Sequence, residues 1–303
     1  MEQGKFIDYI QYEKRYSPHT VSAYRNDLVQ FYSYLESRYS ISDIREVTHA
    51  MIRSWLAWMM EKKISPRSVN RKLTTLKSYY KFLLKEGIVT VNPMRKVSSL
   101  KTSKKLPSFV EKEKMDLLFE TVDFGKDFPA LRDRLIIELL YATGMRLSEL
   151  VNLNESDVDF HHSHIKVLGK RNKERLIPFS NKLATLLKTY LQEKVPFATN
   201  SGLPVTECNR MDSPLFITNS GTRIYPRFVY RTVTKYLARV TTLRKVSPHV
   251  LRHTFATHML NSGAELNAVK ELLGHANLSA TQVYTHNTIE KLKKIYKQAH
   301  PKA

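Results

Sequence analysis

Six polar side chains in the last two-thirds of the chain form a set that could break and rejoin a phosphodiester. They are two arginines, a lysine, two histidines and a tyrosine: Arg146, Arg252, Lys170, His249, His275 and Tyr284. A phosphoryl-transfer transition state gathers negative charge on its equatorial oxygens, and fixed cations stabilise that charge. Arginine suits this task because its planar fork binds two oxygens and stays charged near neutral pH. A tyrosine can be the nucleophile and conserve the bond energy in a phosphotyrosine. The set therefore predicts chemistry on phosphodiesters without a metal or a cofactor.

Arg146 lies where a helix is predicted to begin. The apolar segment 131–141 predicts a preceding helix, which Thr143 and Gly144 interrupt. Glu149 follows Arg146 by three residues, a spacing that places both on one side of a helix. This carboxylate can orient Arg146 or another site residue, or it can lie exposed at the start of the helix. The sequence leaves both alternatives open.

His249 and Arg252 are predicted to share one face of another helix. Ser247 and Pro248 have the residue types that favour the N-cap and the first helical position. His249 then lies in the first turn, and Arg252 lies one turn further along the same face. Backbone amides, an imidazole and a guanidinium would point at one place, which predicts a phosphate-binding site.

Residues 164–179 are predicted to form a β-hairpin. Apolar and polar residues alternate on both sides of the segment GKRNKER, which places Lys170 in the turn. A lysine in an exposed turn is ordinarily just solvated. The neighbouring residues His161, His162 and His164 lack cysteine or carboxylate spacing, so we expect no zinc site there.

Several motifs in a fixed order resemble those of the tyrosine recombinase (phage integrase) family. They are ATGMRLSEL, VLGKRNKER, SPHVLRHTFATH, LLGHANLS and ATQVYTH. The whole chain most resembles the simple Xer-type members, because SPHTVSAYRNDLVQFYSYL near the start is similar to the family's core-binding segment. The resemblance implies a mainly α fold with a small β element (α+β). It also implies a helical core-binding domain and a catalytic domain that close as a clamp around DNA.

The resemblance further implies a role for each candidate residue. Arg146 and Arg252, assisted by the two histidines, would hold the nonbridging oxygens of the phosphate. Tyr284 would attack the phosphorus, and Lys170 would protonate the departing 5′ oxygen as the general acid. Relatives commonly have glycine directly after this lysine, whereas this chain has Arg171. Lys173 therefore remains an alternative general acid.

The charge of the chain favours a polyanionic partner, and double-stranded DNA is the default. The sequence has 49 Lys+Arg against 28 Asp+Glu, a net charge of +21, with a pI near 9.9. Basic residues, Lys72 among them, concentrate between residues 62 and 105. A solvated helix face followed by a disordered linker is the alternative reading of this stretch. The predicted DNA contacts are Arg67, Arg71, Lys77, Lys81, Lys85, Lys101, Lys104 and Lys105.

The sequence predicts two domains joined by a linker. Residues 1–97 are expected to be helical, with Ser17, Thr48 and Ser65 as helix caps and with Trp55 and Trp58 in the core or in helix contacts. The polar, basic segment 98–107 is the predicted linker. The catalytic domain is expected over 108–303. Its last residues, with Ile289, Leu292, Ile295 and Tyr296 at helical spacing, resemble the family's tail that is exchanged between protomers. The alternative is a helix folded back on its own domain.

Assembly and location are expectations as well. Two duplexes with two cleavage sites each imply four protomers, either copies of this chain or a mixture with a paralogous recombinase. A DNA translocase is a further candidate partner. The start of the chain lacks the features of a signal peptide, no apolar run reaches membrane-spanning length, and Cys208 is the lone cysteine. We therefore expect a cytoplasmic protein without a membrane partner.

The resemblance leaves several functions open. Xer-like resolution of chromosome or plasmid dimers is preferred over an integrase of a mobile element. A relaxing enzyme like the type IB topoisomerases would share the site chemistry. A noncatalytic DNA-binding regulator would bind DNA without forming a covalent link.

Overall fold

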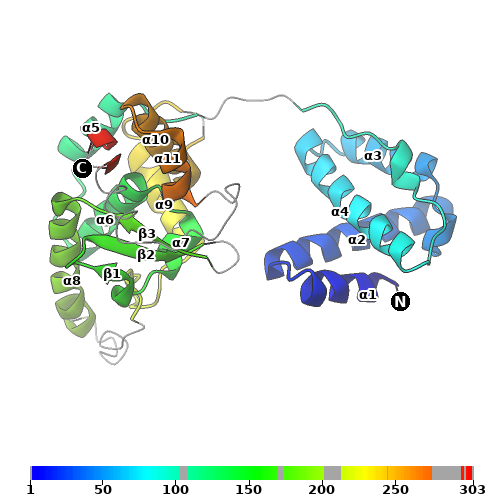
Figure 1. Ribbon diagram of the computed structural model, residues 1–303, viewed down its shortest axis with the longest axis horizontal. Helices are drawn as coiled ribbons and strands as arrows, with labels where there is room; N and C mark the ends of the chain where they lie inside the picture. The colour runs from blue at the N-terminus through cyan, green and yellow to red at the C-terminus, as the bar shows by residue number, and fades with distance from the viewer. Residues whose placement is uncertain are drawn as a thin grey trace. The chain divides into compact units, whose positions relative to one another are not determined.

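The structure is a computed structural model that describes residues 2–102, 108–169, 173–200, 213–243, 245–274, 295–296 and 298–301 (Figure 1). The chain forms two compact units, Met1–Lys105 and Leu106–Ala303. Helices dominate both units, and the second also contains a small antiparallel sheet. The predicted mainly α fold with a small β element is confirmed.

The N-terminal unit consists of helices whose starts follow the predicted caps. Its elements are α1 (Glu2–Asp8), a π-helical turn (Tyr9–Glu13), α2 (Pro18–Tyr39), a 3-10 turn (Ile44–Glu46), α3 (His49–Glu61), α4 (Pro66–Lys85) and a second 3-10 turn (Pro93–Lys96). The side chains of Ser17, Thr48 and Ser65 accept hydrogen bonds from first-turn amides, which supplies partners for otherwise free N–H groups. The predicted caps are thus confirmed.

The core of this unit lies between α2, α3 and α4. Trp55 is fully buried, with its ring 4.9 Å from that of Phe31. Trp58 is 38% exposed, and its ring centroid lies 5.4 Å from that of Tyr34 on α2. Trp58 therefore makes a contact between helices and is not a core residue. The apolar stripe of α4 is buried as predicted: Val69, Leu73, Leu76, Tyr80 and Leu83. Its opposite face is therefore turned to solvent.

The C-terminal unit is built around α6 (Phe128–Thr143), which is buried along most of its length. Around it lie α5 (Lys112–Glu120), α7 (Leu147–Asn152), α8 (Asn181–Asn200), α9 (Pro226–Leu237), α10 (Pro248–Asn261) and α11 (Leu266–Leu273). Helices α8, α9 and α10 all pack against α6 (Figure 1). This packing fixes the base on which the candidate site is built.

The sheet contains the predicted hairpin and one strand that the sequence did not reveal. Strands β2 (His164–Leu168) and β3 (Glu174–Pro178) pair antiparallel, with Ile165 opposite Ile177. The short β1 (Val158–Asp159) pairs with β2, which gives the order β1-β2-β3. The hairpin prediction is confirmed in its strands, and its turn residue Lys170 lies outside the described residues.

The last described residues pack on their own unit. Tyr296 is 1% exposed, and its ring stacks on His300 with the centroids 4.9 Å apart. The His300 ring in turn contacts Tyr141 of α6 and Phe255 of α10. Ile289 and Leu292 lie outside the described residues. Among the described helices, none has the length and apolar character needed to cross a membrane.

Candidate active site

Arg146 is placed by a tight break between α6 and α7. Gly144 ends α6 in the left-handed conformation, with φ of +59°. A Cβ at this position would lie 2.4 Å from the Phe255 ring of α10, so glycine is required for both its backbone angle and its close approach. Arg146 is then the N-cap residue of α7, as the sequence predicted. Its side chain remains 31% exposed.

Arg252 is anchored from two sides. It is 9% exposed on α10, and its Nη1 donates to the Gly144 carbonyl at 2.7 Å. Its Nη2 donates to the Leu273 carbonyl of α11, also at 2.7 Å. Burial, together with the positive charge of Arg146, lowers the pKa of Arg252 to about 10. The guanidinium therefore remains charged at neutral pH and is held in a fixed orientation.

Glu149 lies at the centre of the site. It is 5% exposed, and its carboxylate accepts from the backbone N–H of Arg146 at 2.7 Å and from Arg146 Nη1 at 2.8 Å. Burial would raise the pKa of this carboxyl, but hydrogen bonds from Arg175 and Arg146 lower it to about 2. Of the two alternatives left open by the sequence, the orienting carboxylate is confirmed.

Arg175 is a buried member of the site that sequence reasoning missed. It lies on β3, is 4% exposed, and donates from Nη1 and Nη2 to the two Glu149 oxygens at 2.8 and 2.7 Å. Its Nε donates to the Leu272 carbonyl at 2.8 Å. Two-residue alternation along the strand was the available signal, because Arg175 shares a face with the buried Ile177.

Three arginines from three elements contact consecutive carbonyls at the end of α11. Arg175 binds the carbonyl of Leu272, Arg252 that of Leu273, and Arg146 that of Gly274, the last at 3.2 Å. Carbonyl groups at a helix C-terminus lack partners within the helix and carry partial negative charge, so cations are favourable there. Arg146 and Arg252 are thus brought together beside the residue that precedes His275.

The remaining predicted catalytic residues have different outcomes. His249 lies exposed in the first turn of α10, where the sequence placed it. Ser247 occupies the N-cap position without a side-chain capping bond. Lys170, His275 and Tyr284 lie outside the described residues. The glycines that directly precede two of them, Gly169 and Gly274, are described.

The predicted DNA contacts of the N-terminal unit lie largely on the solvent face of α4. Its exposed basic residues are Arg67, Arg71, Lys77, Lys81 and Lys85. Lys101 is exposed beyond the helix, while Lys104 and Lys105 lie outside the described residues.

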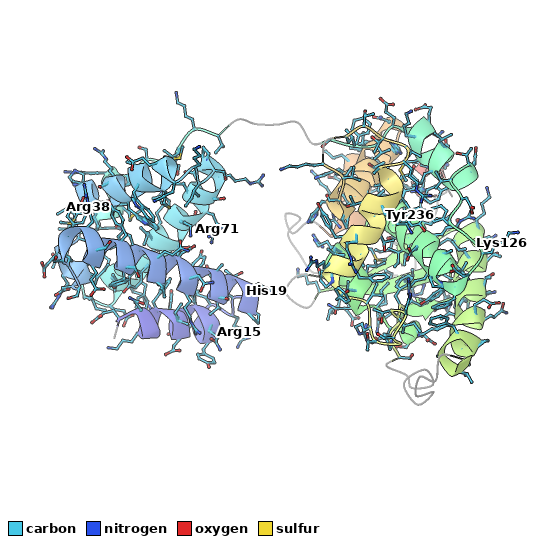
Figure 2. All side chains as sticks on the ribbon, turned by 180° about the vertical axis from the view of Figure 1, so that it is seen from behind. Arg15, His19, Arg38, Arg71, Lys126 and Tyr236 are labelled. Atoms are coloured by element: carbon cyan, nitrogen blue, oxygen red, sulfur yellow. The ribbon has the colours of Figure 1, made fainter. Side chains whose placement is uncertain are left out.

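One residue of the predicted basic stretch is not on this surface. Lys72 is 8% exposed, and its Nζ donates to Asp27 of α2 at 2.9 Å and to Gln30 at 2.6 Å. Arg71 also binds Asp27 through both Nη atoms, at 2.6 and 2.7 Å, and stays half-exposed on the surface of α4 (Figure 2). Lys72 belongs to the basic stretch but not to its exposed face, because it neutralises a buried carboxylate.

A second basic helix face was not predicted. Helix α9 contains no acidic residue, and it exposes Arg227, Tyr230, Arg231 and Lys235. The i, i+4, i+8 spacing of its three cations was the sequence signal for this face. A cationic face with an aromatic residue suits contact with nucleic acid.

The histidines at the start of β2 and just before it have a carboxylate neighbour. Asp159 accepts from the backbone N–H of His162 at 2.8 Å and from its Nδ1 at 2.7 Å. His164 Nε2 lies 3.8 Å from the same carboxylate. The hydrogen bonds from His162 lower the pKa of Asp159 to about 2. Asp159 and His162 thus form a hydrogen-bonded turn that leads into β2.

Comparison with known proteins decides the family. The pattern described as "Phage integrase family" matches residues 108–291, and that of "Phage integrase, N-terminal SAM-like domain" matches residues 4–87. The chain belongs to the phage integrase family of tyrosine recombinases. The resemblance seen in the sequence motifs is confirmed.

Similar proteins narrow the relationship to the Xer type. Tyrosine recombinase XerC of Oceanobacillus iheyensis is 42% identical over 299 residues, covering 98% of this chain and 95% of the relative. That of Listeria monocytogenes is 38% identical over 307 residues and covers 100% of both chains. This recombinase is therefore of the Xer type.

Solved structures share the fold. The XerH site-specific recombinase bound to a palindromic difH substrate has a TM-score of 0.71 and 20% identity, over 96% of this chain and 83% of that one. The Tn1549 transposon integrase in complex with a circular intermediate DNA has a TM-score of 0.68 and 18% identity, over 97% and 98%. At these identities the similarity establishes the fold alone.

Proposed function

We propose that this recombinase cuts and rejoins strands at a specific double-stranded DNA site through a covalent 3′-phosphotyrosyl intermediate. Tyr284 attacks the phosphorus, and Lys170 protonates the 5′ oxygen that leaves. The free 5′ hydroxyl of a partner duplex then attacks the phosphotyrosine and takes over the phosphate. Each strand exchange conserves the number of phosphodiester bonds, so it needs no ATP. The arginine cations are proposed to stabilise the charge that a metal ion would otherwise stabilise.

The charge on the phosphate is stabilised by a preorganised group of cations. Arg146 and Arg252 hold the nonbridging oxygens, and His249 and His275 assist them. The observation that carries this proposal is the pair of arginines held side by side against the end of α11, which directly precedes His275. Groups that are fixed before the reaction need no reorganisation when the charge develops.

DNA binding is assigned to the exposed basic faces of the two units. The α4 face and Lys101 belong to the N-terminal unit, and the α9 face belongs to the C-terminal unit. We propose that both units contact one duplex and close around it as a clamp, with the segment 98–107 as the linker. Release of counterions from about six to ten phosphates would lower the affinity roughly 10³–10⁵-fold between about 50 and 200 mM salt.

The proposed biological task is Xer-like resolution of chromosome or plasmid dimers in the cytoplasm, which the XerC relatives support. Integration of a mobile element is the second candidate, favoured by the fold shared with a transposon integrase. Four protomers would act on two duplexes, as copies of this chain or with a paralogous recombinase. A DNA translocase is the proposed activating partner.

Assembly through the C-terminal tail is part of the proposal. In the isolated chain, Tyr296 and His300 pack on their own unit against Tyr141 and Phe255. Exchange would transfer this same contact to a neighbouring protomer. A short apolar helix gains most of its stability from the surface that receives it, so the exchange would couple assembly to catalysis.

Covalent capture tests the function. The wild-type protein is incubated with fragmented genomic DNA, SDS-resistant adducts are recovered, and the attached DNA is sequenced. We expect one recurrent site for the wild type and for Tyr12→Phe, whose tyrosine is exposed in the N-terminal unit. Tyr284→Phe should bind the same site without forming an adduct. An undiminished adduct from Tyr284→Phe would place the nucleophile elsewhere.

The captured DNA also separates the alternatives. A regulator would bind DNA but give no adduct at all. A relaxing enzyme would relax plasmids that lack any recurrent site, whereas a recombinase would exchange strands only between two copies of it. A captured site at the ends of a mobile element would favour integration over dimer resolution.

A further inference from the structure

Arg175 connects three elements that carry the proposed reacting groups. It is itself on β3, one strand of the β2–β3 hairpin, whose connecting segment contains Lys170 in the sequence. Through Glu149 it reaches the start of α7, where Arg146 shares the same carboxylate. Through its Nε it reaches the Leu272 carbonyl of α11. One buried guanidinium thus joins a hairpin, a helix start and a helix end.

Two glycines lie directly against this guanidinium. A Cβ on Gly169, the residue before Lys170, would lie 3.5 Å from Arg175 Nη1 and 3.2 Å from the Lys173 carbonyl. A Cβ on Gly274, the residue before His275, would lie 3.2 Å from both Cδ and Nη1 of Arg175. The backbone therefore approaches Arg175 closely just before each of two proposed catalytic residues. Gly274 also has φ of +64°, a second reason for glycine there.

We propose that Arg175 is a positioning residue that fixes the positions of Arg146, of the hairpin at Gly169 and of the end of α11 relative to one another. This inference rests on the proposed function, since the roles of those groups come from it. Arg175 acts through its neighbours and does not itself hold the phosphate. Its donors point to a carboxylate and a carbonyl in different elements.

Arginine is needed here because of its shape. The planar fork binds both oxygens of Glu149 while Nε, on the same rigid plane, binds Leu272. A lysine would keep the charge but present it from a single nitrogen. The relative position of β3 and α11 would then lose one of the hydrogen bonds that fix it.

The decisive measurement compares rate with affinity. Arg175→Lys is assayed in single-turnover cleavage of a nicked duplex that carries the site captured by the wild type. At saturating protein we expect the rate to fall about 10²-fold, with affinity for the duplex changed less than about threefold, because a misplacement of about 1 Å has a cost of this size. A wild-type rate for Arg175→Lys would overturn the proposal.

Lys194→Met is the matched control. Lys194 is also a buried cation of the C-terminal unit, 1% exposed, and it binds Glu155 and the Pro214 carbonyl. Loss of this ion pair should lower the stability of the unit and leave the cleavage rate of the folded protein unchanged. If Lys194→Met slows cleavage as much as Arg175→Lys, any buried cation matters equally and no positioning role remains.

A double variant separates positioning from stability. Arg175→Met leaves the buried Glu149 carboxylate with Arg146 as its remaining hydrogen-bonded cation, which should destabilise the unit. Adding Glu149→Gln removes that charge, so we expect the stability to recover in part and the rate to stay low. Recovery of the rate together with the stability would show that Arg175 serves the fold alone.

Hydrogen exchange keeps this inference distinct from the proposed function. If the wild type forms no adduct on any DNA, the proposed function has failed, but the coupling by Arg175 can still be measured. The backbone amides of Arg146, Gly169 and Gly274 should exchange faster in Arg175→Lys than in Lys194→Met. If the two variants exchange these three amides at equal rates, the proposed positioning role of Arg175 is overturned.

Discussion

Asp27 in the N-terminal unit and Glu149 in the C-terminal unit are both buried carboxylates that accept hydrogen bonds from two cationic side chains. At Asp27 the cations are Arg71 and Lys72, neighbours on α4, and Thr75 of the same helix adds a hydroxyl. This network joins two helices, α2 and α4. It explains how one pair of helices is fixed.

The network around Glu149 extends further. Arg146 and Arg175 come from α7 and β3, and each also donates to a carbonyl at the end of α11. Buried charge of the same kind therefore serves two purposes. A network confined to two packed helices supports the fold, whereas one that continues to Leu272 and Gly274 also fixes the backbone just before His275, a proposed catalytic residue.

If the Glu149 network positions the proposed catalytic residues, DNA cleavage should depend on the residues that lie next to it in the chain. Lys170→Ala should slow cleavage of ordinary DNA roughly 10²–10⁴-fold, because the leaving oxygen then lacks a proton donor. A 5′-bridging phosphorothiolate should restore a rate near wild type, since a thiolate leaves without a proton. Rates of single-turnover adduct formation on the two substrates give the result. Sulfur rescue of Lys173→Ala instead would move the general acid to Lys173.

Replacing Arg252, which lies beside the Glu149 network, and Arg71, which belongs to the Asp27 network, should have different effects on cleavage and binding. Arg252→Ala, beside the Glu149 network, should cleave roughly 10²–10³-fold more slowly on both oxygen and sulfur substrates, because its deficit is charge stabilisation. Arg71→Ala should bind more weakly yet cleave at the wild-type rate when protein is saturating. A slow Arg71→Ala at saturation would remove the distinction between the networks.

Removing the N-terminal carboxylate should destabilise only its own unit. Asp27→Ala leaves Lys72 buried without its ion pair, a change that costs about 3–5 kcal/mol in comparable cases. Trp55 and Trp58 are the two tryptophans of the chain, so urea unfolding followed by tryptophan fluorescence reports on this unit. Asp43→Ala, at an exposed ion pair, should change the unfolding free energy far less than Asp27→Ala does. Similar losses of unfolding free energy in the two variants would show that burial of the ion pair does not increase its contribution.

Acid should weaken the Glu149 network in a defined range. Its folded pKa of about 2 lies below the ordinary value of 4.5, so its contribution is complete above pH 4.5 and is lost as the pH falls toward 2. The difference in unfolding free energy between wild type and Glu149→Gln should therefore narrow by about 3 kcal/mol across this range. Urea unfolding followed by circular dichroism measures it. A constant difference would show that the carboxylate is not stabilised by its cations.

The smallest effects should come from single surface cations. Lys81→Ala on α4 and Arg231→Ala on α9 should each reduce the slope of log affinity against log salt by about one. Lys126→Ala, exposed before α6, serves as the control and should leave the slope unchanged. Filter binding of the captured site over a salt series measures the slopes. An unchanged slope for Arg231→Ala would remove α9 from the DNA surface.

The sequence predicted what local patterns determine. Capping residues located α2, α3 and α4, and the Thr143-Gly144 break placed Arg146 at the start of α7. Alternation predicted the β2–β3 hairpin. These features depend on neighbours within a few residues, so their physical causes can be read directly from the chain.

The sequence could not predict contacts between residues that are far apart in the chain. Lys72 looked like one more surface cation because its partner Asp27 lies 45 residues away on another helix. Arg175 was not identified because its partners Glu149 and Leu272 are 26 and 97 residues distant. Burial of a charge becomes understandable only when the fold supplies the opposite charge, and spacing along the chain does not reveal that.

The end of α11 places a limit on how this protein can vary. Leu272, Leu273 and Gly274 offer successive carbonyls to arginines that belong to three other elements. An α-helix turns by about 100° per residue, so inserting or deleting one residue in α11 would rotate all three acceptors away at once. Substitutions on the exposed side of α11 leave the directions of these three carbonyls unchanged. The exposed side chains of α11 can therefore diverge, whereas the length of the helix cannot change.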